Sequence, residues 1–117
     1  MEELESKQGG EIMSWKEIKI KDIPEIEKVV AEFEVGEVKK TPWGKFRVRV
    51  LERQDGSFIA ITNLMFIDHT GCENSGYGEG KTIEEALEKA IKDFMSYLPD
   101  DRELTEDDFT VADPYDF

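Results

Sequence analysis

Cysteine, histidine and long apolar runs are scarce in this chain. Cys72 is the only cysteine among 117 residues, which excludes an intramolecular disulfide and fits a reducing cytoplasm. No stretch approaches the roughly 18 consecutive apolar residues that a membrane-spanning helix needs. The first twelve residues are also too acidic and polar for a signal peptide. We therefore expect a cytoplasmic protein that does not contact a membrane.

Basic residues are outnumbered nearly two to one. The chain has 28 acids and 15 bases, which gives a net charge of −13. Residues 36–81 are almost neutral, whereas residues 100–117 contain eight acids and a single base, Arg102. Repulsion from phosphates argues against direct binding of nucleic acid, and we expect the basic run 39–53 to be the solvated face of a strand. Such acidity promotes solubility, and it also attracts basic proteins.

Two segments have helical periodicity. Residues 24–34 follow Asp22, a residue type that caps helices, and residues 83–97 follow Thr82, with Glu85 completing a capping box. The apolar positions expected to face the core are Ile23, Ile26, Val29, Val30 and Phe33 in the first helix, and Ile83, Leu87, Ala90, Ile91, Phe94 and Leu98 in the second. Residues 14–20 fit either a short strand or a helical turn.

Strict alternation over residues 45–50 predicts a half-buried strand, and residues 58–67 form its return strand. Asp55-Gly56 between them predicts a tight hairpin, and a two-residue loop would set Val50 opposite Ile61. The core face would then contain Phe46, Val48, Val50, Ile59, Ile61 and Met65. The other face would contain Arg47, Arg49, Arg53, Phe58, Ala60, Thr62 and Leu64. This second face is mixed, and with free sheet edges it favours a homodimer.

The predicted fold class is α+β: a small antiparallel sheet of about three strands, packed on one face by the helices 24–34 and 83–97, in an α-β-β-β-α order. A short third strand is expected near residues 73–77. Residues 1–12 read as a disordered lead-in, residues 13–99 as one domain, and residues 100–117 as an acidic segment with aromatic residues. The aromatic residues predict that this last segment docks on its own strand face or on a partner.

The Gly-rich loop 68–81 contains most of the residues that suggest chemistry. Gly80-Lys81-Thr82 resembles the end of a phosphate-binding loop, but the pattern lacks its first glycine, and Glu79 would repel phosphate. His69 and Cys72 lie close in sequence, but a zinc site needs more ligands of these types. We therefore predict no catalytic residues, no metal and no cofactor.

Residues 44–98 resemble the core domain of the HicB antitoxin family. The matching features are the strand FRVRV, the hairpin DGSFIAI, a Gly-Cys pair, and the helix in GKTIEEALEKAIKDF. HicB-like domains begin with a strand, however, where this sequence predicts the helix 24–34. The order helix, hairpin, strand, helix also resembles a double-stranded-RNA-binding domain, but Glu84 and Glu85 stand where that family has phosphate-binding lysines. The HicB resemblance implies a small inhibitory protein that binds a basic, RNA-cutting toxin.

Charge and resemblance together predict a non-catalytic interaction protein. It would be antitoxin-like, or an inhibitor from a phage or mobile element, and would bind a basic protein that acts on nucleic acid. The residues expected to contact this partner are Asp100, Asp101, Glu106, Asp107, Asp108, Phe109 and Tyr115. The alternative is a small-ligand or nucleotide-binding protein that uses the loop 68–81 at the N-terminus of the helix 83–97.

Overall fold

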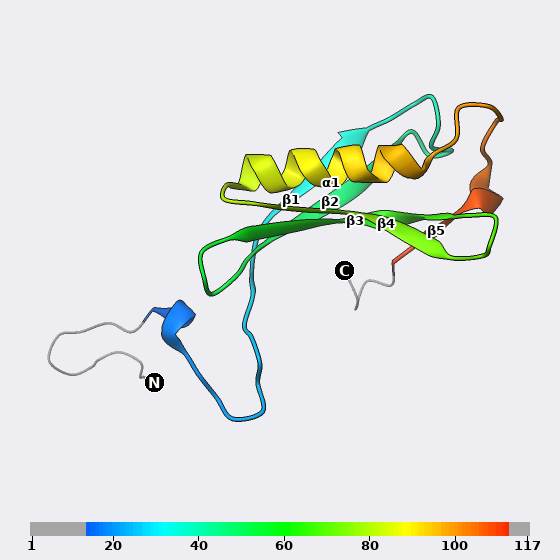
Figure 1. The fold of residues 1–117 in the computed structure, drawn as a ribbon. Coiled ribbons are helices and arrows are strands. Elements are labelled where there is room, and N and C mark those ends of the chain that lie inside the picture. Colours follow the sequence, from blue (N-terminus) through cyan, green and yellow to red (C-terminus); the bar gives the residue numbers. More distant parts are fainter. Residues whose placement is uncertain (1–13, 113–117) are drawn as a thin grey trace, which may run out of the picture.

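The computed structural model describes residues 14–112, which form a single antiparallel sheet with one α-helix along one face (Figure 1). The sheet has the order β1-β2-β3-β4, and a fifth strand, β5, pairs with β3. The strands are β1 (Lys28–Gly36), β2 (Lys45–Glu52), β3 (Phe58–Ile67), β4 (Glu73–Gly80) and β5 (Phe109–Val111). The helices are α1 (Ile83–Tyr97) and two 3-10 turns, η2 (Trp15–Glu17) and η3 (Glu106–Asp108). The α+β class is therefore confirmed, but with five strands and one α-helix in the described residues.

The segment predicted to be the helix 24–34 is instead strand β1. Apolar residues occupy every second position from 31 to 35 and alternate with glutamates, which is the period of a strand. Valines at three positions of β1 favour extended backbone, and the strand pairs with β2 along its whole length. Asp22, expected to cap a helix, has a φ of 70° and lies in a turn. Tertiary pairing thus overrides the local helical pattern.

The hairpin between β2 and β3 has a three-residue loop, one residue longer than predicted. The Arg53 N–H donates to the Ser57 carbonyl at 2.8 Å, and Gly56 adopts the positive φ, 91°, that such a loop requires. Val50 consequently lies opposite Ala60 rather than Ile61. Because neighbouring strand residues point to opposite faces, this shift inverts the predicted faces of β3. Ala60, Thr62, Leu64 and Phe66 are buried on the helix side, and Ile59, Ile61 and Met65 lie on the open side.

Helix α1 begins and ends where the sequence predicts. The Thr82 side chain accepts the Glu85 N–H at 3.0 Å, while the Glu85 carboxylate accepts the Lys81 N–H at 2.8 Å, so the predicted capping box is present in its Thr82 half. The helix packs mainly on β4 and β3 and contacts β2 less. Its fully buried positions are Ala86, Ala90 and Phe94.

The short strand expected near residues 73–77 is confirmed as β4, which also contains three glycines of the predicted loop, Gly76, Gly78 and Gly80; at Gly76 and Gly78 the missing side chain allows α1 to approach closely. A Cβ atom added to Gly78 would lie 2.5 Å from the Ala86 carbonyl oxygen and 2.5 Å from the Ala90 nitrogen. A Cβ atom at Gly76 would meet Phe94 and the Ala90 carbonyl at similar distances. Close packing against the helix therefore accounts for the glycine content of residues 76–78.

The C-terminal part of the described chain completes the core. Phe109 of β5 is 6% exposed, and its ring lies 6.5 Å from that of Phe94, which in turn lies 4.9 Å from that of Phe46. Residues 109–111 thus belong to the sheet of the domain predicted for 13–99. The predicted lead-in 1–12 lies outside the described residues.

Gln54 in the β2–β3 loop is hydrogen-bonded to the N-terminal segment of the described chain, residues 14–20. Its side-chain nitrogen donates to the backbone oxygens of Trp15 at 3.2 Å and of Ile18 at 2.9 Å. Of the two forms that the sequence allowed for residues 14–20, the helical turn is present as η2.

We predict that Gly78→Ala lowers the free energy of unfolding by about 3 kcal/mol, because the new methyl group meets helix backbone that cannot move aside. Urea denaturation measures the loss. Gly36→Ala is the matched control, since a Cβ atom there meets nothing within 4 Å. Equal stability of the two variants would contradict the close packing of β4 and α1.

Candidate functional site

One edge of β3 is shared by two strands. β4 pairs with residues 58–61 and 65–67 of β3, with a register shift between the two stretches, so β2 and β5 must both occupy the opposite edge. β2 pairs with residues 58–62 of β3, and β5 pairs with residues 64–66. The first residues of β2 therefore diverge from β3, and β5 takes their place. We call this divergence the fork.

Asn63 holds the two arms of the fork. Its side-chain oxygen accepts the Arg47 N–H at 2.8 Å, in place of a bond from the backbone ladder. Its backbone oxygen accepts the Ala112 N–H, also at 2.8 Å. Asn63 thus lies between the residues of β3 that pair with β2 and those that pair with β5, and it is hydrogen-bonded to β2 and to the residue after β5.

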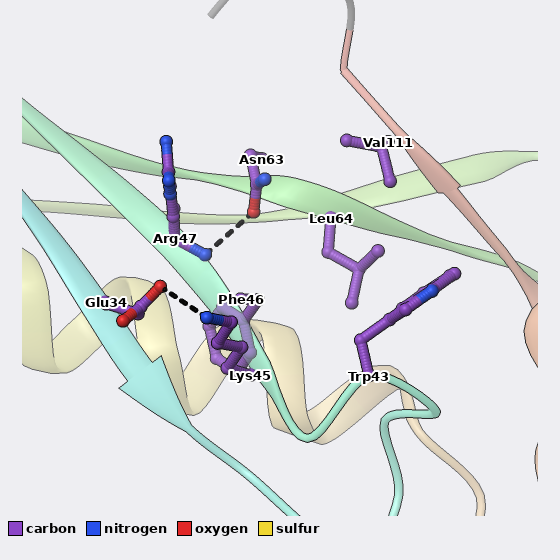
Figure 2. Close-up of a pocket in the computed structure, with 8 residues that line it drawn as sticks. All are labelled: Glu34, Trp43, Lys45, Phe46, Arg47, Asn63, Leu64 and Val111. Carbon is purple, nitrogen blue, oxygen red and sulfur yellow. Dashed lines mark hydrogen bonds and ion pairs between the residues drawn. The ribbon is translucent and has the colours of Figure 1, made fainter.

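A cavity of about 230 Å³ lies at the fork, which we call the fork pocket (Figure 2). Its apolar lining consists of Phe46 and Leu64, which are buried, and Trp43 and Val111, which are 45% and 53% exposed. Its polar lining consists of Glu34, Lys45, Arg47 and Asn63. A further hollow, over Glu32 and Phe33 on β1, shares Glu34 and Arg47 with it.

The cations of the fork pocket face acids of β1. The Lys45 Nζ atom lies 3.1 Å from a Glu34 carboxylate oxygen, and an Arg47 guanidinium nitrogen lies 3.9 Å from a Glu32 oxygen. These pairs are more than 40% exposed, so each contributes little stability. Lys45 and Arg47 of the basic run therefore lie exposed on strand β2, as the strand interpretation expected, and each also pairs with an acid of β1.

Residues 98–108 join α1 to β5, and we restrict the name acidic segment from here on to residues 100–107 of this connection, the first part of the acidic region 100–117. Among the predicted partner-binding residues, Asp100, Asp101, Glu106 and Asp107 are exposed. Lys40 pairs with Asp100 and also donates to the Leu98 carbonyl. No basic residue lies in the last turn of α1, so the negative end of the helix dipole adds to these carboxylates.

Asp108 and Phe109 have structural roles. The Asp108 carboxylate accepts two hydrogen bonds from Arg102 and one from the Thr105 N–H, and the Arg102 bonds in particular lower its pKa. Phe109 is buried in the core, so its ring is not part of the surface. Tyr115 lies outside the described residues.

The acidic segment and the fork pocket are neighbours. The segment runs through η3 directly into β5, whose last residue, Val111, lines the pocket. At the junction the Trp43 ring meets the Phe109 ring edge to face, with 6.1 Å between centroids. One end of the molecule therefore combines exposed carboxylates with an apolar hollow.

The face of the sheet opposite α1 is a second candidate surface, which we call the open face. Ile59, Ile61 and Met65 lie half-buried along β3, between the Arg47–Arg49 side of β2 and Tyr77 of β4. At one end Arg53 contacts Glu79 at 3.1 Å and donates to the Tyr77 hydroxyl at 3.1 Å. The face is mixed, as the sequence predicted, although its β3 residues differ from those expected.

The predicted ligand loop is a turn followed by strand β4. Asp68 accepts hydrogen bonds from Thr70, Cys72 and Asn74, and the bond from the Thr70 hydroxyl contributes most to lowering its pKa. His69 and Cys72 are exposed on this turn. At the start of α1, the Lys81 and Glu85 N–H groups already have side-chain acceptors. Ligand binding at this loop stays a prediction.

The chain has no recognisable relatives among known proteins: no family model, no curated protein and no solved structure matches it. The described residues contain no group of three or more histidine, cysteine or acidic side chains that could hold a metal ion. Within the same residues, no helix has the length and apolar character needed to cross a membrane.

Sequence reasoning missed the fork pocket because it needs three segments far apart in the chain. Trp43, Asn63 and Val111 come from a loop, a central strand and the acidic C-terminal region. The available signal was the alternating triplet at 109–111 inside an otherwise acidic segment, which is typical of a short strand.

We predict that Asn63→Ala lowers the free energy of unfolding by about 1 kcal/mol, since the Arg47 N–H loses its acceptor. It should also speed hydrogen exchange of the Arg47 amide, measured by NMR. Asn63→Asp retains an acceptor oxygen and should keep the amide protected. Unchanged exchange in the alanine variant would show that Asn63 does not hold the fork.

Proposed function

We propose that this chain is a non-catalytic, acidic interaction protein that binds a basic protein acting on nucleic acid, in the manner of an antitoxin or a phage-encoded inhibitor. The observation that carries the proposal is the exposure of four carboxylates, Asp100, Asp101, Glu106 and Asp107, after the C-terminal end of α1, whose last turn contains no basic residue. Lys40 and Arg102 offset only part of this charge. A surface of this kind would speed encounter with a cationic partner and favour its correct orientation.

The HicB resemblance remains part of this proposal. HicB-like domains begin with a strand, and the sequence alone predicted a helix over residues 24–34. The strand Lys28–Gly36 removes that difference. In this proposal the protein works in the cytoplasm, where the exposed Cys72 remains a thiol.

We predict that the variant D100N/D101N/E106Q/D107N binds its partner about tenfold more weakly than the natural chain, because four exposed ion pairs are lost. The measurement is capture of basic proteins from an extract of the source cell, with elution in rising salt. Binding by the natural chain should weaken steeply as salt screens the charges.

The matched control is E17Q/E73Q/E84Q/E88Q, which changes four exposed acids elsewhere and raises the net charge by the same amount. It should retain its partner. Equal losses in the two variants would assign binding to net charge rather than to the acidic segment. Retention by the first variant, or binding that ignores salt, would refute the proposal.

The open face supports a second prediction, that two copies self-associate. Both copies carry a net charge of −13, so salt should strengthen this association, opposite to its effect on a basic partner. Sedimentation at low and high salt measures the mass. Ile61→Glu on the open face should shift the protein to monomer, whereas Val38→Glu, at a position 83% exposed, should not. A monomer at every salt concentration would refute the homodimer.

A further inference from the structure

The fork pocket has the size of a single side chain. Its volume of about 230 Å³ is smaller than the ~300–1,000 Å³ typical of sites for small organic ligands. Two of its walls, Trp43 and Val111, are large apolar residues that remain about half exposed. Exposed apolar residues bordered by polar ones mark contact surfaces, and pockets of this kind receive the anchor residues of interfaces.

The lining of the pocket favours an aromatic anchor. Phe46 and Leu64 supply an apolar floor, and the exposed Trp43 ring supplies an edge or face for ring contact. Lys45 and Arg47 stand at the rim in exposed ion pairs with β1, where their cationic groups can contact the face of an incoming ring. An aliphatic side chain would make the apolar contacts with Phe46 and Leu64 but could not make cation–ring contacts with Lys45 and Arg47.

The surroundings of the pocket favour basic residues on either side of that anchor. The acidic segment leads into the β5 wall, and exposed carboxylates at Glu106 and Asp107 precede it by only a few residues. On the opposite side, Glu34 lines the pocket and Glu32 lines the adjoining hollow, and their exposed pairs with Lys45 and Arg47 leave carboxylate oxygens available to a further cation. Lysine or arginine next to the anchor would therefore meet carboxylates in both directions.

We propose that the fork pocket binds an aromatic side chain, flanked by basic residues, on the protein partner of this chain. This inference rests on the proposed function and adds the anchor that fixes the partner's position. The acidic segment attracts the partner, and the pocket buries one ring at the centre of the interface.

The test uses three peptides, each blocked at both ends, with ¹⁵N-labelled full-length protein. Lys-Lys-Trp-Lys-Lys should shift the NMR signals of the Trp43 indole N–H, the Asn63 side-chain amide and the Arg47 amide. Lys-Lys-Ala-Lys-Lys should shift only signals of residues 100–107, and should bind about fivefold more weakly. Glu-Glu-Trp-Glu-Glu should bind more weakly than either.

The outcomes separate the two proposals. If the Trp and Ala peptides of the lysine series bind equally and both affect only residues 100–107, the anchor is refuted and the acidic interaction survives. If the alanine peptide leaves residues 100–107 unaffected, the proposed function fails. Tighter binding of the glutamate peptide than of the lysine peptides would refute the proposal that basic residues flank the aromatic anchor.

Two exposed valines provide a matched pair of variants. Val111→Gln makes one wall of the pocket polar and should reduce binding of the Trp peptide to the level of the alanine peptide. Val38→Gln makes the same change in the β1–β2 connection, at a residue that is 83% exposed and does not line the pocket. It should leave the preference for tryptophan intact. Equal effects of the two variants would overturn the assignment of the pocket.

Discussion

The shared edge of β3 is the constraint on which the candidate site depends. A strand edge can pair with only one neighbour at each position, so β5 can join β3 only where β2 has left it. Asn63 lies between the part of β3 that pairs with β2 and the part that pairs with β5. It accepts one hydrogen bond from Arg47 of β2 and one from Ala112, directly after β5. The divergence of β2 from β3 leaves the fork pocket, and the buried side chains of Phe46 and Leu64 form its base. A β2 strand that followed β3 throughout would exclude β5 and close the pocket.

The position of α1 determines which surfaces are left for partners. Because Gly76 and Gly78 have no side chains, α1 can pack closely on β4 and β3. The helix therefore covers β2 only in part. One helix on one side leaves the opposite side of the sheet with half-buried apolar residues such as Ile61. The same close approach directs the end of α1, and the acidic segment after it, toward the β1–β2 connection, where Lys40 contacts Asp100.

Local signals predicted local structure well and register poorly. The α1 helix follows from Thr82, Glu85 and the periodic apolar positions, all within a few turns. The β2–β3 hairpin was also predicted, but its face assignment depended on whether Gln54 belongs to the loop. Residues 24–34 carried both helical and alternating patterns, and only pairing with β2 decides between them. The exposed acids at 100–107 follow from composition, whereas the fork pocket depends on contacts between residues more than 60 positions apart, which no local pattern contains.

Charge and shape would contribute differently to recognition by this end of the molecule. Exposed carboxylates act at a distance and raise the rate of encounter, but solvent and salt screen them, so they discriminate weakly among basic proteins. A pocket for one side chain acts only on contact, and it slows dissociation of the protein that fits it. Neither feature alone would select a partner from the many basic proteins that act on nucleic acid. Their adjacency, enforced by the Trp43–Phe109 contact and the continuity of the acidic segment with β5, gives a small acidic domain a physical route to specificity.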